Sequence, residues 1–147
     1  MSLARLAAGT VIEIEEPAES ATWVAIAEPR ELGDIGESGS FVDATHLSIT
    51  DATRQYIAGL KDPPDKAFVF ADIPADAGQI ALKAAADAQE TRVIRISLPA
   101  TTPASATQAT MSVVLNGWVN QGPVVDGAVM LAVTGKQSGS TTRGIPA

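Results

Sequence analysis

The stretch Thr91-Arg-Val-Ile-Arg-Ile-Ser-Leu98 alternates apolar and polar side chains at the two-residue period of a β-strand. Ile94 and Ile96 fall on one face of this strand, and Arg95 and Ser97 fall on the other. A strand with this pattern packs one face on a core and leaves the other in solvent, as strands of antiparallel sheets commonly do. We therefore expect a fold built mainly from half-buried strands.

Similar patterns occur on both sides of this stretch. They predict further strands in residues 10–15, 22–26, 41–47, 53–60, 66–73, 110–119 and 124–134, the last with a bulge or tight bend at Asp126-Gly127. Residues 28–40 combine three glycines, a proline and several acidic residues, which predicts a long irregular loop. The paired prolines of Lys61-Asp-Pro-Pro-Asp65 predict a stiff turn.

One helix is predicted, at about residues 77–88. Asp76 and Gln79 fit a capping box, in which each side chain accepts a hydrogen bond from the backbone N–H of the other residue. Gln79, Lys83 and Asp87 share a narrow polar stripe, whereas nearly all other positions are Ala, Ile or Leu. A helix so apolar is expected to pack closely on a sheet, and a second side can be covered by a neighbouring subunit.

These elements fit a single domain in a chain of 147 residues. The predicted fold is mostly β (α+β), a β-sandwich or open barrel of about eight strands flanked by one α-helix. We assign residues 10–135 to this β-domain, 1–9 to an N-terminal arm and 136–147 to a C-terminal arm. The C-terminal arm is rich in Gly, Ser and Thr and shows no strand pattern, so we expect it to be mobile in the free subunit.

Charge is concentrated in the first half of the chain. Residues 1–76 hold 14 acidic and 5 basic residues, whereas residues 77–147 hold 3 acidic and 5 basic residues. Nucleic acid is gripped with Lys and Arg, so this balance argues against a nucleic-acid-binding protein. The chain has no cysteine, which excludes disulfides, and no stretch approaches the roughly 20 apolar residues of a membrane span.

No catalytic centre is expected. His46 is the one histidine, and a Ser-His-Asp arrangement would need Ser48 or another hydroxyl as nucleophile with Asp43 or Asp51 as the orienting acid. No Gly-x-Ser-x-Gly motif supports such an arrangement. Paired carboxylates of a glycosidase stay open on sequence alone, although the six aromatic residues are few for a sugar site. We predict a protein that is not an enzyme.

No cofactor or metal site is expected either. The glycines of residues 33–39 imitate a phosphate-binding loop, but Asp34 and Glu37 would repel phosphate and no helix follows. Asp34, Glu37 and Asp43 offer oxygens to a calcium ion, yet they lack EF-hand spacing. A hinge-like loop is the simpler interpretation of this segment.

Six landmarks follow one another along the chain. They are a strand pair ending in Thr22-Trp-Val-Ala-Ile26, the acidic loop 28–40, Phe41-Val-Asp-Ala-Thr45, Arg54-Gln-Tyr-Ile-Ala-Gly-Leu-Lys-Asp62, the Ala-rich helix, and the segment from Gly117-Trp-Val to Val133-Thr-Gly135. In order and spacing they resemble the tail tube (major tail) proteins of long-tailed, siphovirus-type phages, over about residues 10–135. The resemblance implies the phage tail tube fold and a structural protein of the virion.

In that family, six subunits form a ring whose inner sheets join into a continuous barrel. The resemblance therefore implies hexameric rings that are assembled in the host cytoplasm and stack into the tail of the virion. Double-stranded DNA would pass through the tube without specific binding during ejection. The implied partners are further copies of this chain, a tape measure protein in the lumen, and tail terminator and tail tip or baseplate proteins, with no membrane contact.

The family's contacts between rings use the N-terminal arm, the long loop after the second strand and the C-terminal arm. On this sequence the residues expected in those contacts are Arg5, Leu6, Glu31, Leu32, Asp34, Ile35, Glu37 and Arg143. An acidic lumen would repel DNA phosphates, and Glu13 and Glu15, on the polar face of strand 10–15, are the candidates to line it. The helix would pack at the outside of the barrel, near a neighbour.

Other interpretations stay open at this point. A tail terminator would form one ring and never elongate. A contractile-tail tube and a type VI secretion tube are related ring formers. A small virion decoration or binding module would instead remain discrete in solution and bind preassembled particles or glycans.

Overall fold

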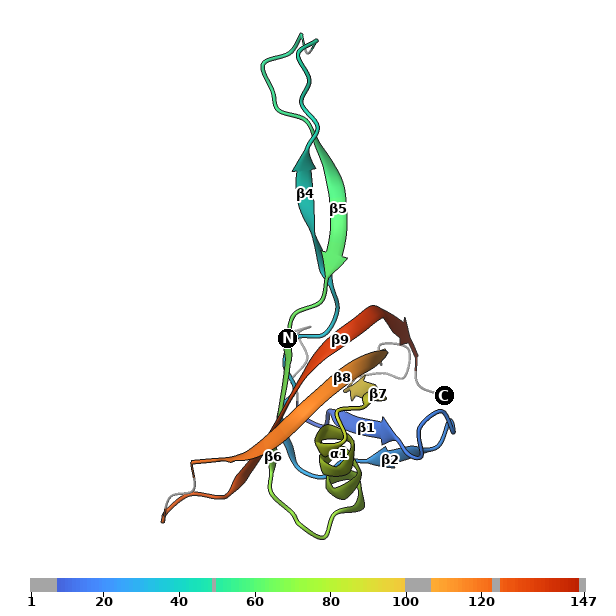
Figure 1. Cartoon of the computed structure of the whole chain (residues 1–147), viewed down its shortest axis with the longest axis vertical. Coiled ribbons are helices and arrows are strands. Elements are labelled where there is room, and N and C mark those ends of the chain that lie inside the picture. The colour runs from blue at the N-terminus through green and yellow to red at the C-terminus, as the bar shows by residue number, and fades with distance from the viewer. Residues whose placement is uncertain (1–7, 49, 100–106, 123–124, 146–147) are drawn as a thin grey trace, which may run out of the picture.

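The computed structural model describes residues 8–48, 50–99, 107–122 and 125–145. Within these ranges, seven strands form one antiparallel sheet (Figure 1), and a separate pair forms a second. In spatial order the large sheet runs β2 (Trp23–Ala25), β1 (Val11–Glu15), β7 (Thr91–Leu98), β8 (Thr107–Gln121), β9 (Met130–Gly144), β6 (Lys66–Ala71) and β3 (Pro29–Glu31). The second sheet pairs β4 (Ser38–Asp43) with β5 (Tyr56–Asp62). The prediction of a mostly β fold with one helix is confirmed.

The large sheet curls around its core because its two outermost strands follow each other in the chain. Only residues 26–28 separate β2 from β3, so the ends of these strands lie at most about 14 Å apart. The linking segment is bonded to both sides: Ile26 N donates to Ile12 O at 3.0 Å, and Ala71 N donates to Glu28 O at 3.0 Å. The link therefore closes one end of the sheet over its apolar interior.

The core is mainly aliphatic with two aromatic side chains. It comes from alternate residues of the strands, from Ile26 of the link and from three residues of the helix that spans Ala77–Asp87. Its buried members are Ile12, Ile14, Ile26, Phe68, Phe70, Leu82, Ala85, Ala86, Ile94, Ile96, Ala109, Met111, Val113, Leu115, Leu131 and Val133. The alternation read in strand 91–98 is thus confirmed, with Ile94 and Ile96 fully buried. We call the side of the sheet that carries these residues the core face, and the opposite side the free face.

Helix α1 (Ala77–Asp87) packs its buried side against the core face, mainly over β8. Asp76 caps the helix as predicted, its carboxylate accepting from Gln79 N at 3.0 Å. The other half of the predicted capping box is wrong. The Gln79 side chain is fully buried and accepts from Ile73 N at 2.9 Å, while its amide donates to Ala71 O and Ala27 O.

The predicted polar stripe of the helix is also wrong, because Gln79 is buried. Gln79 is held inside because its amide satisfies three backbone groups at the junction of β6, α1 and the β2–β3 link. Ile80 takes the outer position instead and is 53% exposed. Lys83 bonds Asp72 at 3.1 Å and lies over the Trp118 ring, which leaves Asp87 as the exposed member of the stripe.

Several strand bounds differ from the prediction. The predicted C-terminal arm is wrong for residues 136–144, because β9 continues along β8 as far as Gly144. Between the pairs Thr110–Thr142 and Ser112–Ser138, β9 has more residues than β8, and Gly139 (φ 89°) lies in the bulge that accommodates them. The predicted loop 28–40 is shorter, since it contains β3 and the start of β4. Strand 53–60 and the turn 61–65 shift, because β5 spans Tyr56–Asp62. Asp126-Gly127 lies in the β8–β9 turn instead of within a strand.

Candidate assembly surfaces

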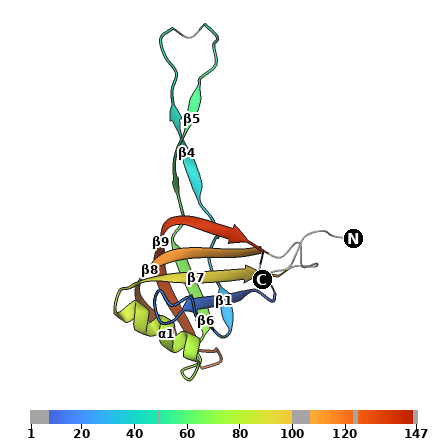
Figure 2. The same ribbon diagram turned by 90° about the vertical axis from the view of Figure 1, so that its right-hand side faces the viewer.

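The β4–β5 hairpin projects far from the body of the protein (Figures 1 and 2). Phe41 pairs with Ala58 and Val42 pairs with Ile57, so the two faces of the ribbon both carry apolar side chains. Phe41 is 78% exposed and Leu60 is 91% exposed. A two-stranded ribbon has no core of its own and is marginally stable in water. This hairpin therefore presents exposed apolar side chains on both of its faces.

The root of the hairpin is residues 32–37, which connect β3 to β4 and lie along the core face. Leu32 and Ile35 pack against the core cluster. The Lys66 ammonium, 1% exposed, donates to Asp34 O. Thr141 N donates to the Glu37 carboxylate at 3.3 and 3.4 Å. Two apolar and two polar contacts thus fix the base from which the hairpin projects.

The electrostatics of the root follow from its burial. Burial lowers the pKa of the Lys66 ammonium, and the negative charges of Asp34 and Glu37 oppose that shift. Hydrogen bonds from Thr141 lower the pKa of the Glu37 carboxyl. The root therefore holds a buried cation that is bonded to the backbone carbonyl of Asp34, and burying this cation costs desolvation energy.

The pH dependence of stability gives a test of this burial. A lysine whose pKa is lowered in the folded state leaves the unfolded chain binding more protons, so stability rises with pH up to the ordinary value near 10.5. Lys66→Met removes this contribution. We expect the stability of the wild type relative to Lys66→Met to increase between neutral pH and pH 10 in urea unfolding curves. Lys136→Met, at a side chain 78% exposed, is the matched control and should leave the profile unchanged.

Two edges of the large sheet lie open at opposite ends of the β8–β9 pair. β7 pairs with the first half of β8 only, through Val114, and β6 pairs with the first half of β9 only, through Gly135. No described strand therefore pairs with the outer edge of residues 116–121 or with that of residues 136–144. Unpaired strand edges are templates for another strand. The second of these edges carries the Glu37 contact to Thr141 N.

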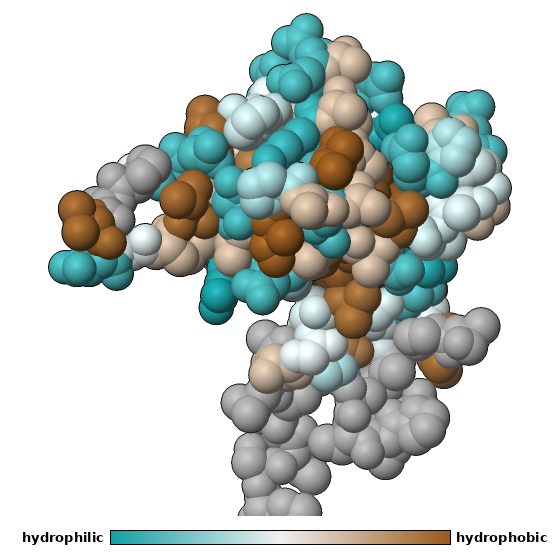
Figure 3. Space-filling view, turned by 90° about the horizontal axis from the view of Figure 1, so that it is seen from below, coloured by the Kyte–Doolittle hydropathy of each residue, from teal (hydrophilic) through white to brown (hydrophobic). Residues whose placement is uncertain are grey.

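The β8–β9 turn end forms a further exposed surface (Figure 3). Val125 is fully exposed in the turn, and Val119 and Val129 are exposed beside it. On the neighbouring helix, Ile80 is half exposed. Apolar side chains are thus present at the end of the molecule opposite the hairpin as well as on the hairpin itself.

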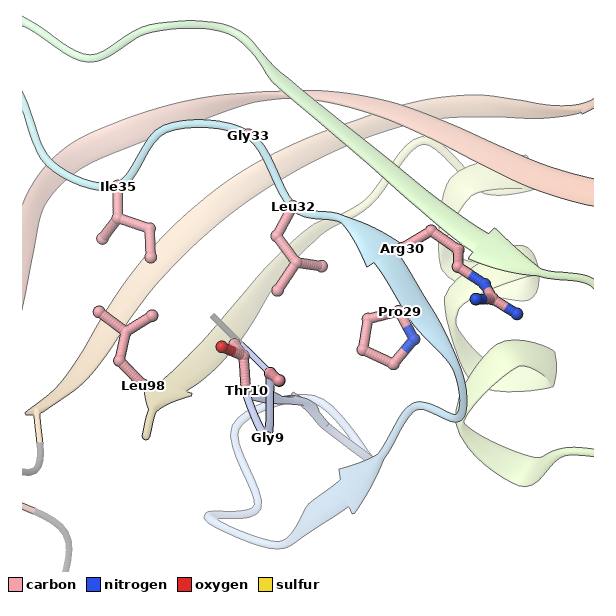
Figure 4. A pocket seen from close by; sticks show the side chains of 9 residues that line it. Gly9, Thr10, Pro29, Arg30, Leu32, Gly33, Ile35 and Leu98 are labelled. Atoms are coloured by element: carbon pink, nitrogen blue, oxygen red, sulfur yellow. The ribbon is translucent and has the colours of Figure 1, made fainter. Parts of the chain in front are cut away.

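A shallow groove lies beside the hairpin root (Figure 4). Leu32, Ile35 and Leu98 point into it, and Gly9 and Pro29 line its wall. Its volume is about 290 Å³, and Thr10 and Arg30 join the apolar residues of its lining. The groove brings no group of acid, base and nucleophile together.

The structure brings most of the predicted inter-ring residues together. Leu32, Asp34, Ile35 and Glu37 form the hairpin root, and Arg143 joins them by donating to Ile35 O at 3.2 Å. This cluster links the predicted loop to the predicted C-terminal arm. Its role in contacts between rings stays a prediction.

The other predicted site residues lie apart. Glu31 is exposed at the end of β3, and Arg5 and Leu6 lie outside the described residues. Glu13 bonds Arg95 at 2.9 Å, and Glu15 is 9% exposed and accepts from Glu19 N at 2.6 Å. Neither Glu13 nor Glu15 presents a free carboxylate, and their place in a lumen stays a prediction.

Sequence reasoning missed the exposed apolar residues of the hairpin. Phe41 and Tyr56 stood in two predicted strands, but nothing indicated that these strands pair only with each other. The polar stretch 44–55 between two apolar segments was the available signal of a hairpin.

The candidate catalytic and metal residues do not form a site. His46 and Ser48 are exposed in the hairpin tip, and Asp43 accepts from Thr45 N at 2.9 Å and from Arg54 at 3.3 Å. The Thr45 hydrogen bonds lower the pKa of Asp43. Among the residues that the structure describes, no group of three or more His, Cys, Asp or Glu could hold a metal ion. No described helix is long and apolar enough to cross a membrane.

Comparisons with known proteins agree with this arrangement. A model of the phage tail tube protein family matches residues 5–142. No curated protein sequence matches the chain. The chain superposes on a chain of the anti-feeding prophage baseplate with a TM-score of 0.71, at 8% identity, covering 97% of each chain.

Two further solved structures share the fold. The SPP1 tail tube superposes with a TM-score of 0.68, at 12% identity, over 93% of this chain and 77% of that one. The tube-terminating cap of the anti-feeding prophage superposes with a TM-score of 0.69, at 8% identity, over 99% of this chain and 95% of that one. At these identities the likeness shows a common fold.

Proposed function

Because this chain belongs to the phage tail tube protein family, a family of structural and non-enzymatic proteins, we propose that six copies form a ring and that rings stack into the tail tube. In this proposal the tube is that of a long-tailed, siphovirus-type phage, and it conducts DNA into the host. The tape measure protein occupies the lumen during assembly, and terminator and tip proteins bind the two ends. The observation that supports self-assembly best is the pair of open edges on β8 and β9.

The two edges fit a closed ring because they face opposite ways on one antiparallel strand pair. Residues 116–121 of one copy can add to residues 136–144 of the next, and the antiparallel alternation of strands then continues from subunit to subunit. A contact between two different surfaces of the same chain repeats, and it closes into a ring when the rotation allows. Closure would leave neither edge unpaired.

The hairpin supports the second step, the stacking of rings. It projects from one end of the body, and exposed apolar residues are found at the opposite end as well. Burying an apolar side chain of the size of leucine stabilises a contact by about 2 kcal/mol. Six hairpins acting together would make a junction between rings strong even if each single contact were weak.

A disulfide ladder tests the ring. The chain has no cysteine, so pairs can be introduced freely. We expect Asn120→Cys combined in turn with Ser138→Cys, Ser140→Cys or Thr142→Cys to give, for the correct register, covalent oligomers up to six subunits on mild oxidation of tubes. Asn120→Cys alone should give none above a dimer. Tubes that yield no ladder with any of the three pairs would rule out this edge contact, and a ladder ending elsewhere than six would rule out the hexamer.

A tail terminator is the second candidate, because the tube-terminating cap shares the fold over almost the whole chain. A terminator forms a single ring and does not elongate. Negative-stain electron microscopy of the purified protein at high concentration, with and without the tail initiator complex, separates the two. Filaments of stacked rings support the tube subunit, whereas single rings under all conditions support the terminator.

A further inference from the structure

The open edge of β9 is in contact with the root of the hairpin. Thr141 N donates to both carboxylate oxygens of Glu37, at 3.4 and 3.3 Å. The Arg143 guanidinium donates to Ile35 O at 3.2 Å. The two segments lie close together, since a Cβ atom at Gly36 would be 2.8 Å from Arg143 Nη2. Figures 1 and 2 show β9 passing the base of the hairpin, and we call these contacts the clasp.

The clasp takes the place that a neighbouring strand would occupy. A strand that adds to an open edge accepts hydrogen bonds from the N–H groups of that edge through its own carbonyls. In the free subunit the Glu37 carboxylate accepts from Thr141 N instead. The proposed ring needs the edge of residues 136–144 for the next copy of the chain. The clasp and that copy therefore compete for one edge.

The bulge in β9 holds Thr141 in position for the clasp. Gln137 is 8% exposed, and its amide donates to Gly139 O at 3.1 Å and to Thr141 Oγ1 at 2.8 Å. Hydrogen bonds from Thr141 lower the pKa of the Glu37 carboxyl, so the acceptor is an ionised carboxylate at neutral pH. The clasp therefore joins a fixed donor to a charged acceptor.

The clasp is nevertheless weak enough to open. Its distances of 3.2 to 3.4 Å lie at or beyond the long end of ordinary N–H···O bonds, which extend to about 3.2 Å. Arg143 is exposed, and water can replace either partner of an exposed hydrogen bond at little cost. Strand pairing along residues 136–144 would instead supply several backbone bonds at once. A second copy can therefore displace the clasp.

The hairpin carries the clasp residue Glu37. This residue directly precedes β4, whose second residue, Gly39, pairs with Lys61 of β5. The positive charge of Lys61 also favours the ionised form of Glu37 and contributes to its lowered pKa. The hairpin thus offers this carboxylate a counterion once it leaves Thr141. A contact that reorients the hairpin reorients Glu37 with it.

We propose that the clasp is an autoinhibitory cap, which blocks the β9 edge in the free subunit and opens when the hairpin docks on an existing ring. This inference rests on the proposed function and names the step that controls its ring contact. The open conformation is then a minor one in solution, and the apparent affinity between free copies falls in proportion to the open fraction. Docking favours the open conformation by binding it more tightly. Free subunits therefore join a growing tube in preference to one another.

The first test removes the clasp carboxylate with Glu37→Ala. We expect this variant to form rings or tubes without initiator at a protein concentration at least about tenfold lower than the wild type needs, measured by sedimentation and electron microscopy. Asp87→Ala is the matched control, because it removes the same charge from an exposed position on α1 and should behave as the wild type. A role of Glu37 in contacts between rings predicts the opposite sign. An unchanged or higher concentration for Glu37→Ala would overturn the proposal.

The second test detects the clasp in the free subunit through hydrogen exchange of the Thr141 amide, followed by NMR. We expect this amide to exchange at least about tenfold faster in Glu37→Ala than in the wild type, because its acceptor is lost. Amides of β7, in the middle of the sheet, should exchange alike in both proteins and show that the fold is intact. Equal rates at Thr141 would show that no clasp protects the edge in solution.

The third test locks the clasp. The chain has no cysteine, so Glu37→Cys combined with Thr141→Cys can be joined by a short reagent with two maleimide groups. We expect locked subunits to stay single even with initiator, and the same double variant without the reagent to assemble. Each single variant treated with the reagent is the control for the added group and should assemble as well.

Failure of the inference is distinguishable from failure of the proposed function. Locked subunits that enter tubes as readily as unlocked ones would overturn the cap and leave the tube subunit in place. Absence of rings and tubes from the wild type, with initiator present, would contradict the proposed function itself.

Discussion

Replacing Leu60 with Asp is expected to abolish tube formation while leaving the free subunit folded. Leu60 is 91% exposed on β5 and contributes nothing to the core, so the change should not alter the stability of the monomer by more than about 0.5 kcal/mol. In the proposed tube, each hairpin loses roughly 2 kcal/mol of apolar contact and gains a buried charge. Six copies multiply that loss to more than about 10 kcal/mol per junction between rings.

Electron microscopy and sedimentation of the variant measure this effect. Ser40→Asp is the matched control, because it introduces the same charge on the partner strand without removing apolar surface. We expect Ser40→Asp to assemble more weakly than the wild type and Leu60→Asp not to assemble. Long tubes of Leu60→Asp with normal appearance would contradict the role given to the hairpin.

Gly78→Ala should destabilise the subunit by about 3 kcal/mol, although the same change in an exposed helix stabilises by about 1 kcal/mol. A Cβ atom at Gly78 would lie 2.2 Å from Ala25 O and 2.7 Å from Ile26 Cα. Both are backbone atoms at the junction of β2 with the link that closes the sheet, and Gln79 holds that link to α1. The neighbours therefore cannot move aside without loss of these hydrogen bonds.

Chemical unfolding followed by circular dichroism measures the change at Gly78. Ala84→Gly, at an exposed position of the same helix, is the control and should cost about 1 kcal/mol through helix propensity alone. A variant Gly78→Ala as stable as the wild type would mean that the helix can shift away from β2.

Much of the fold could be predicted because its strands bury alternate residues. The periodicity of residues 91–98 and 66–71 corresponds directly to burial, and the alanine-rich helix had a recognisable N-cap at Asp76. The second half of β9 could not be predicted, because its Gly, Ser and Thr residues bury almost no apolar area. Pairing with β8 fixes that segment, and pairing between distant segments leaves no local pattern.

Some residues of the candidate site could likewise be predicted from the sequence, and others could not. The loop after the second strand was found from its glycines and acids, and its contacts with β9 then place Arg143 beside Ile35. Lys66 was not found, because a lysine inside a strand usually lies in solvent, and its burial depends on the carbonyl of Asp34. The hairpin was missed because the patterns of its two strands do not show that they pair with each other and with no described strand of the large sheet.

The order of strands in the sheet also sets the timing of folding during synthesis. β1 leaves the ribosome early, but its inner neighbour in the sheet is β7. The partner of Glu13 in that strand, Arg95, is synthesised 82 residues later. At 5–20 residues per second that delay is about 4 to 16 s. During this time Ile12 and Ile14 lie in a nascent strand with one short partner, β2. Charged residues beside an apolar strand oppose its pairing with other chains, and Glu13 and Glu15 occupy such positions next to Ile12 and Ile14.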